Sequence, residues 1–262
     1  MTYEMILSDI RDAVCTITLN RPEKLNAMAD GMVPELLHAM DAADHDDAVN
    51  VILLTGAGRG FCAGLDLTQN REAREPSRWE QLDDLGQVSR QALAVLACSK
   101  PVIAAINGAA AGAGLAMALN CDTRVMSAGA RVTTGYARRG LSPDGAMSYT
   151  LPRLVGMTRA ADLIFTARDI IAEEALSIGL VAHVYPAESF REDAHAYAAS
   201  IARNAPIGLV QSKRLLAQSL TNPLLTQLKQ EMQLIRAAFQ TEDVKEAVRA
   251  FAEKRQPTFR GR

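Results

Sequence analysis

Two glycine-rich turns, each directly after a run of residues typical of a buried strand, constrain this chain more than any other feature. The first turn is Gly-Ala-Gly-Arg-Gly-Phe-Cys-Ala-Gly at 56–64, after the apolar run at 49–55. The second is Asn-Gly-Ala-Ala-Ala-Gly-Ala-Gly at 107–114, after the run at 101–106, and an apolar helical segment at 115–119 follows it. Because strand, turn and helix patterns recur in this order, the sequence predicts an α/β fold.

The segments around the two turns follow the same alternation of strands and helices. Residues 13–20 alternate branched and polar side chains as a strand does, and short strands are expected at 123–126 and 132–133. Apolar residues recur at helical spacing from Met32, with Asp30 as the expected N-cap, and a second helix is expected at 78–97. The charged segment 68–77, which contains Pro76, is expected to be a mobile surface segment.

From about residue 188 onward, helical patterns dominate, at 189–202, 208–219, 223–240 and 241–254. The third carries apolar residues at three- and four-residue spacing, which indicates either core packing or a subunit interface. These residues are Leu224, Leu228, Met232, Ile235 and Phe239. We expect a core at 1–195 and a helical oligomerisation region at 196–262, without a flexible linker between them.

Composition and charge exclude several classes of protein. The net charge of −2 over 262 residues lacks the basic excess of a nucleic-acid binder. The longest apolar stretches, such as 93–97 and 102–106, are far shorter than a membrane span, and residues 1–10 do not resemble a signal peptide. The four cysteines form no Cys-x-x-Cys pair or metal-ligand cluster, so we expect reduced thiols, no metal site and a cytoplasmic location.

Glycine turns after buried strands serve three chemistries. The spacing Gly56-x-Gly58-x-Gly60 is not that of a dinucleotide fingerprint, and no Gly-Lys-Ser/Thr of a phosphate-binding loop follows. No Gly-x-Ser-x-Gly nucleophile elbow occurs either. The remaining chemistry is an oxyanion hole, in which glycines let backbone N–H groups point at a substrate oxygen. For either turn alone, tight packing of strands is the simpler explanation, and the pair together favours the oxyanion hole.

Six segments in order carry a family resemblance over nearly the whole chain. They are NRPEKLNA at 20–27, LTGAGRGFCAGLD at 54–66, KPVIAAING at 100–108, CD at 121–122, LPRLVG at 151–156 and ALSIGLV at 175–181. Together they resemble the crotonase (enoyl-CoA hydratase/isomerase) superfamily. The resemblance implies a spiral of ββα units, C-terminal helices that build homotrimers or hexamers, and an acyl-CoA substrate with no cofactor beyond its coenzyme A.

The resemblance also implies the residues of the site. The thioester oxygen is expected between the N–H groups of Leu65 and Ala113, although the family usually has glycine at the second position. Two C-terminal residues, Phe251 and Lys254, match residues that reach the coenzyme A of a neighbouring subunit. The other expected contacts with the acyl-CoA are Lys24, Leu25, Ala27, Ala63, Asp66, Leu67, Thr68, Ala109, Ala116 and Pro143.

The catalytic positions differ from those of the hydratases in the family. Those enzymes activate water with two glutamates, and here Ala116 and Tyr136 stand at the matching positions, so neither carboxylate is present. Asp144 matches the aspartate of some isomerases and of 4-chlorobenzoyl-CoA dehalogenase, and it also lies in a good turn sequence, Ser-Pro-Asp-Gly. The dehalogenase histidine is replaced by Ser89.

We therefore expect isomerisation of an enoyl-CoA through Asp144, with Tyr136 either hydrogen-bonded to substrate or aspartate or forming a pocket wall. Enoyl-CoA hydration with Asp144 or another group as the base, and acyl-CoA binding without catalysis, remain as alternatives. A serine-peptidase relative of the same fold has less support, because no Ser–His pair falls in the turn segments.

Overall fold

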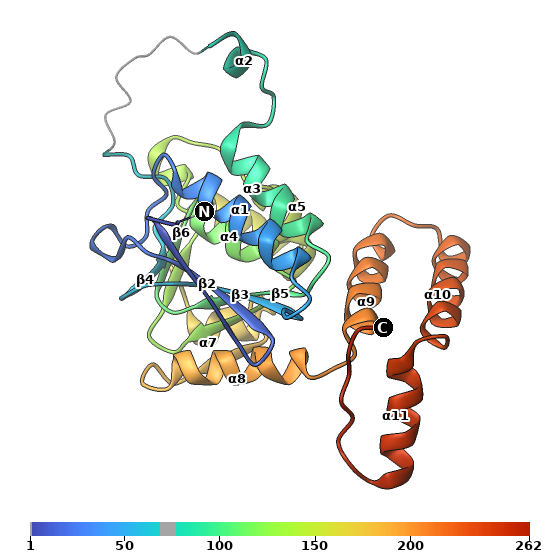
Figure 1. The fold of residues 1–262 in the computed structure, drawn as a ribbon. Helices are drawn as coiled ribbons and strands as arrows, with labels where there is room; N and C mark the ends of the chain where they lie inside the picture. The colour runs from blue at the N-terminus through green and yellow to red at the C-terminus, as the bar shows by residue number, and fades with distance from the viewer. Residues whose placement is uncertain (1, 69–76) are drawn as a thin grey trace.

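The computed structural model describes residues 2–68 and 77–262 and contains two sheets (Figure 1). The larger sheet has the order β1-β2-β3-β5-β7-β10, in which β1 is antiparallel to β2 and the other neighbours are parallel. Its strands are β1 (Ile6–Arg11), β2 (Val14–Leu19), β3 (Val51–Gly56), β5 (Val102–Ile106), β7 (Thr123–Ser127) and β10 (His183–Tyr185). The smaller sheet comprises, in order, β4 (Gly60–Cys62), β6 (Ala109–Ala111), β8 (Arg131–Thr133) and β9 (Ile170–Ile171).

From β3 to β8, consecutive strands alternate between the two sheets, and one or two helices follow each pair. β3 and β4 precede α2 (Arg78–Gln81) and α3 (Gly86–Ala97), and β5 and β6 precede α4 (Ala113–Asn120). β7 and β8 precede α5 (Met147–Val155) and α6 (Met157–Thr166). Each repeat adds one parallel strand to each sheet, so the α/β spiral of ββα units implied by the sequence is confirmed.

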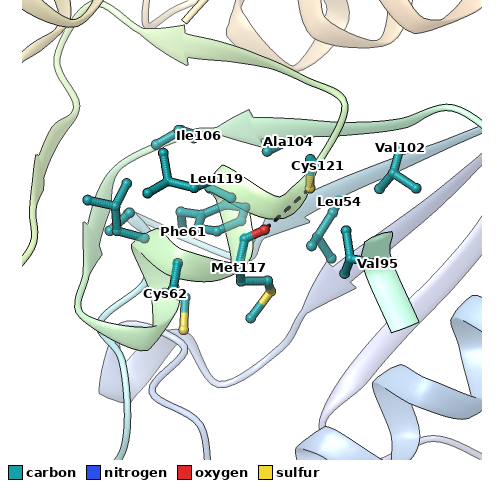
Figure 2. Close-up of a cluster of buried hydrophobic side chains, with 14 of the residues drawn as sticks. Leu54, Phe61, Cys62, Val95, Val102, Ala104, Ile106, Met117, Leu119 and Cys121 are labelled. Atoms are coloured by element: carbon teal, nitrogen blue, oxygen red, sulfur yellow. Dashed lines mark hydrogen bonds between the residues drawn. The ribbon is translucent and has the colours of Figure 1, made fainter. Parts of the chain in front are cut away.

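The main core lies between the two sheets and the helices that follow them, which include α1 (Met32–His45). Figure 2 shows part of this core, where the fully buried Phe61 of the first glycine turn lies among Leu54, Ile106 and Leu119. Apolar packing in the core therefore holds the glycine turns in place, while their backbone N–H groups lie at the edge of the core.

The opposite face of the larger sheet is covered by α8 (Phe190–Ala202), which follows α7 (Ala172–Ser177) along the chain. Buried residues of this helix, from Phe190 to Ala202, pack with Val51 and Ile103 of the sheet. The division expected between residues 195 and 196 falls inside α8, which packs on the core over its whole length.

Three further helices, α9 (Pro206–Ser219), α10 (Leu224–Ala238) and α11 (Glu242–Glu253), form an arm that extends away from the core (Figure 1). The apolar stripe of α10 contacts no core here. Its five members, Leu224, Leu228, Met232, Ile235 and Phe239, are each at least half exposed. The alternative of core packing within one chain is thus excluded for this stripe.

Two local expectations were wrong. Asp30 is not the N-cap of α1, because the chain passes through Gly31 at φ +99° and the helix begins at Met32 without a side-chain cap. The helix expected at 78–97 is divided into α2 and α3. The carboxylate of Asp83 accepts a hydrogen bond from the Leu85 N–H (3.2 Å), a local turn that competes with helix. Most of the segment expected to be mobile, 68–77, lies outside the described residues.

Candidate active site

The two glycine turns touch each other at the start of α4. Gly64 has a φ of +92°, which side-chain-bearing residues rarely adopt. A Cβ on Gly64 would stand 2.8 Å from the Ala111 carbonyl oxygen and 3.6 Å from the Ala113 nitrogen. The backbone of the first turn therefore lies directly against the second, which requires glycine there.

The neighbouring strand register orients the N–H of Leu65. Met28 forms an isolated parallel bridge with Leu65, in which the Met28 N–H donates to the Gly64 oxygen (2.8 Å) and the Asp66 N–H donates to the Met28 oxygen (3.0 Å). In a parallel bridge of this kind, the middle residue directs its own N–H away from the partner. The N–H of Leu65 consequently points to the side opposite Met28.

The second N–H belongs to Ala113, the first residue of α4. The first bond of that helix runs from the Ala116 N–H to the Gly112 oxygen (2.9 Å), so the helix gives the Ala113 N–H no acceptor. The positive end of the helix dipole adds to the attraction of this N–H for an oxyanion. Ala113 and Leu65 both line one cavity, as the oxyanion-hole prediction requires.

This cavity has a volume of about 340 Å³. Its apolar and glycine walls come from the two turns and from the loop before α5, and they surround one carboxylate, one phenol and one guanidinium. The lining residues are Ala63, Gly64, Leu65, Leu67, Gly112, Ala113, Gly135, Tyr136, Arg139, Leu141, Ser142 and Asp144. The structure thus brings together Leu65, Ala113, Tyr136 and Asp144, which are distant in sequence.

Tyr136 donates a hydrogen bond from its hydroxyl to the Asp144 carboxylate at 2.5 Å. The tyrosine side chain is buried, with 7% exposed, whereas Asp144 is exposed to the cavity. Burial, and then the neighbouring Asp144 carboxylate, raise the pKa of Tyr136 well above its ordinary value. The phenol therefore stays protonated at neutral pH and acts as a donor that orients the aspartate. Of the roles expected for Tyr136, both the hydrogen bond to Asp144 and the position in the cavity wall are present.

Tyr136→Phe is expected to lower the turnover number roughly tenfold, because removing one hydrogen bond to a charged group frees the carboxylate to rotate. The Michaelis constant should change little, since the phenyl ring still forms the cavity wall. Steady-state kinetics on an acyl-CoA substrate check this, with Tyr149→Phe on the exposed face of α5 as the matched control. Equal kinetics for all three proteins would remove Tyr136 from the mechanism.

The loop that carries Asp144 is anchored from behind by α4. The buried Asn120 side chain donates to the Gly145 oxygen at 2.9 Å. A Cβ on Gly145, which has a φ of +56°, would lie 3.1 Å from the Cβ of Ala116. Ala116 is 1% exposed and supports this loop. It is not among the cavity-lining residues, so its expected contact with the acyl group is not seen.

The residues expected to bind coenzyme A do not lie in one place, and two of them form hydrogen bonds just after the first turn. Asp66 accepts hydrogen bonds from the Thr68 hydroxyl (2.6 Å) and from Arg21 (3.1 Å). The Thr68 bonds, and then Arg21, lower the pKa of Asp66 to about 2. Both Asp66 and Thr68 thus contribute to the conformation of the chain after the first turn.

The other expected contacts divide between the cavity and the surface. Ala63 and Leu67 line the cavity, while Lys24 is exposed, Leu25, Ala109 and Pro143 are half-buried and Ala27 is buried. Phe251, with 88% exposed, and Lys254 lie at the end of α11, in the arm and away from β4 and β6 (Figure 1). Within one chain they do not reach the cavity.

Sequence reasoning missed Arg139, Leu141 and Ser142, which all line the cavity. The signal available was their proximity to Tyr136 and Asp144 along the chain. The sequence does not show in which direction each side chain points, because this depends on a short 3₁₀ turn, η2 (Ala137–Arg139).

Metal ligands, apolar helices and thiols are the other groups of interest in residues 2–68 and 77–262. No cluster of three or more histidine, cysteine or acidic residues suited to a metal occurs there, and no helix there is long and apolar enough to cross a membrane. The four cysteines are free and buried, and burial raises the pKa of Cys62 to about 12. A thiol in that state is a poor nucleophile, so Cys62 serves as packing beneath the first turn.

Comparison with known proteins decides the family. The family model for enoyl-CoA hydratase/isomerase matches residues 9–262. The chain belongs to this family, within the crotonase superfamily. A relative from Escherichia coli K12 named 1,2-epoxyphenylacetyl-CoA isomerase is 38% identical over 99% of both chains. A short-chain-enoyl-CoA hydratase from Clostridium acetobutylicum is 35% identical over 97% of both.

Solved structures agree with this assignment. The crystal structure of an enoyl-CoA hydratase from Bacillus anthracis superposes with a TM-score of 0.93 at 33% identity, covering 99% of this chain and 100% of the other. As a member of the enoyl-CoA hydratase/isomerase family, the chain is an acyl-CoA enzyme. The relatives include both isomerases and hydratases by name, so the reaction has to be argued from the site itself.

Proposed function

We propose that this enzyme isomerises the double bond of an enoyl-CoA, with Asp144 as the acid–base group. The observation that carries the proposal is the contact between Tyr136 and Asp144 in the cavity that Leu65 and Ala113 line. Ala116 and Tyr136 leave the cavity without the two carboxylates that hydration uses in the hydratases resembled. A single oriented carboxylate suits a reaction in which one proton is removed and then returned.

In the proposed reaction, the Asp144 carboxylate removes a proton from C2 of a 3-enoyl thioester. The electrons of the broken C–H bond delocalise over the acyl chain to give a dienolate, whose oxygen accepts hydrogen bonds from Leu65 and Ala113. Asp144 then returns the same proton to C4, which places the double bond at C2. No external acid, base, oxidant or reductant is consumed, and coenzyme A enters only as part of the substrate, with no separate cofactor.

The direct test compares 3-hexenoyl-CoA with crotonyl-CoA at high enzyme concentration. We expect migration of the double bond in the first and slow or no addition of water to the second. Hydratase activity has specific support in the names of relatives such as the Clostridium enzyme. Fast hydration of crotonyl-CoA would favour that alternative, and thioester binding without either reaction would indicate a catalytically silent acyl-CoA binder.

We also infer a cytoplasmic homotrimer or a hexamer made of two trimers. The location follows from four free buried thiols, which are typical of a reducing compartment. The exposed apolar stripe of α10 supports association of subunits, since contiguous exposed apolar surfaces mark interfaces. The trimeric or hexameric arrangement is the one that the family resemblance implies. In such an assembly Phe251 and Lys254 would contact the coenzyme A of a neighbouring subunit.

Leu224→Lys combined with Leu228→Lys is expected to dissociate the oligomer, because two buried unpaired charges oppose association strongly. Sedimentation velocity should show a trimer or hexamer for the unmodified protein and smaller species for the variant. Thr226→Lys, exposed on the same helix but outside the stripe, is the control and should leave the mass unchanged. A monomer in all three samples would contradict the assignment of the arm.

A further inference from the structure

The guanidinium of Arg139 lines the cavity, and the proposed reaction does not use this cation. Arg139 follows Tyr136 by three residues across η2, and side chains three apart in a 3₁₀ turn lie over one another. Tyr136 and Arg139 accordingly both line the cavity, while the intervening Arg138 does not. The turn ends at Gly140, in the left-handed conformation with φ +67°, which redirects the chain toward Leu141 and Asp144.

The guanidinium lies beside the second glycine turn. Its Nη1 donates to the Gly135 oxygen at 3.3 Å. The same nitrogen is 3.3 Å from the place a Cβ would take on Gly135, and that place is 3.7 Å from the Gly112 nitrogen. Gly112 directly precedes Ala113, so the cation is close to the proposed position of the thioester and not at a remote surface.

Arg138 and Arg139 differ in their partners. Arg138 forms an ion pair with Asp169 at 3.5 Å. No ion pair joins Arg139 to a carboxylate in residues 2–68 and 77–262, and the one carboxylate that lines the cavity, Asp144, accepts its hydrogen bond from Tyr136. The Gly135 carbonyl accepts only one of the five N–H donors of the Arg139 guanidinium. The remaining donors can hold a carboxylate through two parallel hydrogen bonds.

We infer that Arg139 makes the site selective for acyl thioesters whose acyl group carries a second anionic group, a carboxylate in particular. This inference rests on the proposed function in one respect, that an acyl thioester occupies the cavity. A carboxylate on the acyl chain would pair with Arg139 and offset the repulsion that Asp144 exerts on any anion in the same cavity. Arg139 is solvent-exposed at the cavity, and a purely hydrocarbon acyl group would offer its guanidinium no acceptor there.

The test measures binding of saturated thioesters, which cannot isomerise. Dissociation constants of succinyl-, adipyl- and suberyl-CoA are compared by calorimetry with those of butanoyl-, hexanoyl- and octanoyl-CoA, each pair being matched in length. The full oligomeric enzyme should bind at least one carboxylated thioester roughly tenfold more tightly than its neutral partner, the scale of a hydrogen bond to a charged group.

Arg139→Gln should abolish that preference, and Arg139→Lys should keep part of it, because lysine retains the charge without the planar fork. Arg138→Gln is the matched control and should behave as the unmodified enzyme. Three outcomes would overturn the inference: no preference in the unmodified enzyme, a preference that survives Arg139→Gln, or an equal weakening of both thioesters and of free coenzyme A. The last would show that the guanidinium serves a phosphate of coenzyme A.

Failure of this inference and failure of the isomerase proposal are distinguishable. Selectivity for a carboxylate in the binding measurement does not depend on any proton transfer, and it would persist in an enzyme that hydrates its substrate. Conversely, isomerisation of 3-hexenoyl-CoA with no preference for carboxylated thioesters would leave the proposed reaction intact and remove only the role of Arg139.

Discussion

Asp144→Asn is expected to lower the turnover number for double-bond migration by roughly 10²- to 10⁴-fold, the usual contribution of a positioned acid–base group. The amide has the size of the carboxylate and can still contact Tyr136, but it cannot accept a proton from carbon. Because the oxyanion donors Leu65 and Ala113 belong to the backbone, the affinity for a saturated acyl-CoA should stay nearly constant. Stopped-flow or steady-state kinetics, together with calorimetric binding, separate the two effects.

The matched control for this variant is Asp169→Asn, which changes another aspartate of the same region outside the cavity. It should retain full turnover. If Asp144→Asn isomerises the substrate as fast as the unmodified enzyme, the acid–base group lies elsewhere. If it instead loses acyl-CoA affinity along with turnover, Asp144 contributes to binding or to the shape of the loop and the kinetic loss is not evidence of proton transfer.

Gly114→Ala is expected to lower the free energy of unfolding by about 3 kcal/mol or more, at the upper end of the cost of overpacking a core. A Cβ at this position would stand 2.1 Å from the Cys62 carbonyl oxygen, which is backbone and cannot move aside alone. Relief of this clash requires that α4 and β4 separate, and that movement also separates the two oxyanion turns. Chemical denaturation should therefore show a loss of stability, and any folded fraction should have lost turnover.

Gly129→Ala supplies the control for the glycine variant. Gly129 lies between β7 and β8, and a Cβ added there would meet nothing within 4 Å. Its unfolding free energy should remain within about 0.5 kcal/mol of the unmodified value, as is usual for surface substitutions. Similar stabilities for the two alanine variants would contradict the close contact between the glycine turns.

Much of the fold could be predicted from local pattern. Glycine density marked both turns, because only residues without a Cβ permit the approach of Gly114 to Cys62 or of Gly64 to Ala111. The apolar runs of the buried strands and the helical periodicity were equally local signals. They correctly predicted β3, β5 and α10. The division of the expected helix at 78–97 was not readable from periodicity. It coincides with the hydrogen bond from the Leu85 N–H to Asp83 and with the left-handed conformation of Gly86, φ +67°.

The site was predictable to the extent that it consists of backbone. The turns themselves predict backbone donors, and the family resemblance places them at Leu65 and Ala113. The direction of the Arg139 side chain depends on the 3₁₀ turn after Tyr136 and is not given by any sequence periodicity. The burial of Ala116 was also unpredictable, because it arises from the packing of the distant loop residue Gly145 against α4. Contacts between loops far apart in sequence, and not the elements themselves, decide which side chains face the substrate.

Proton exchange in D₂O reports whether one carboxylate moves a proton along an acyl chain that two backbone donors hold. The enzyme would be incubated with 3-hexenoyl-CoA in D₂O and the acyl chain followed by proton NMR. We expect migration of the double bond to C2 with at most partial deuterium at C4, since Asp144 carries the abstracted proton. In Asp144→Asn, we expect neither migration of the double bond nor deuterium at C4. Formation of a 3-hydroxyacyl-CoA in place of the rearranged alkene, or unchanged migration in Asp144→Asn, would contradict the proposed reaction.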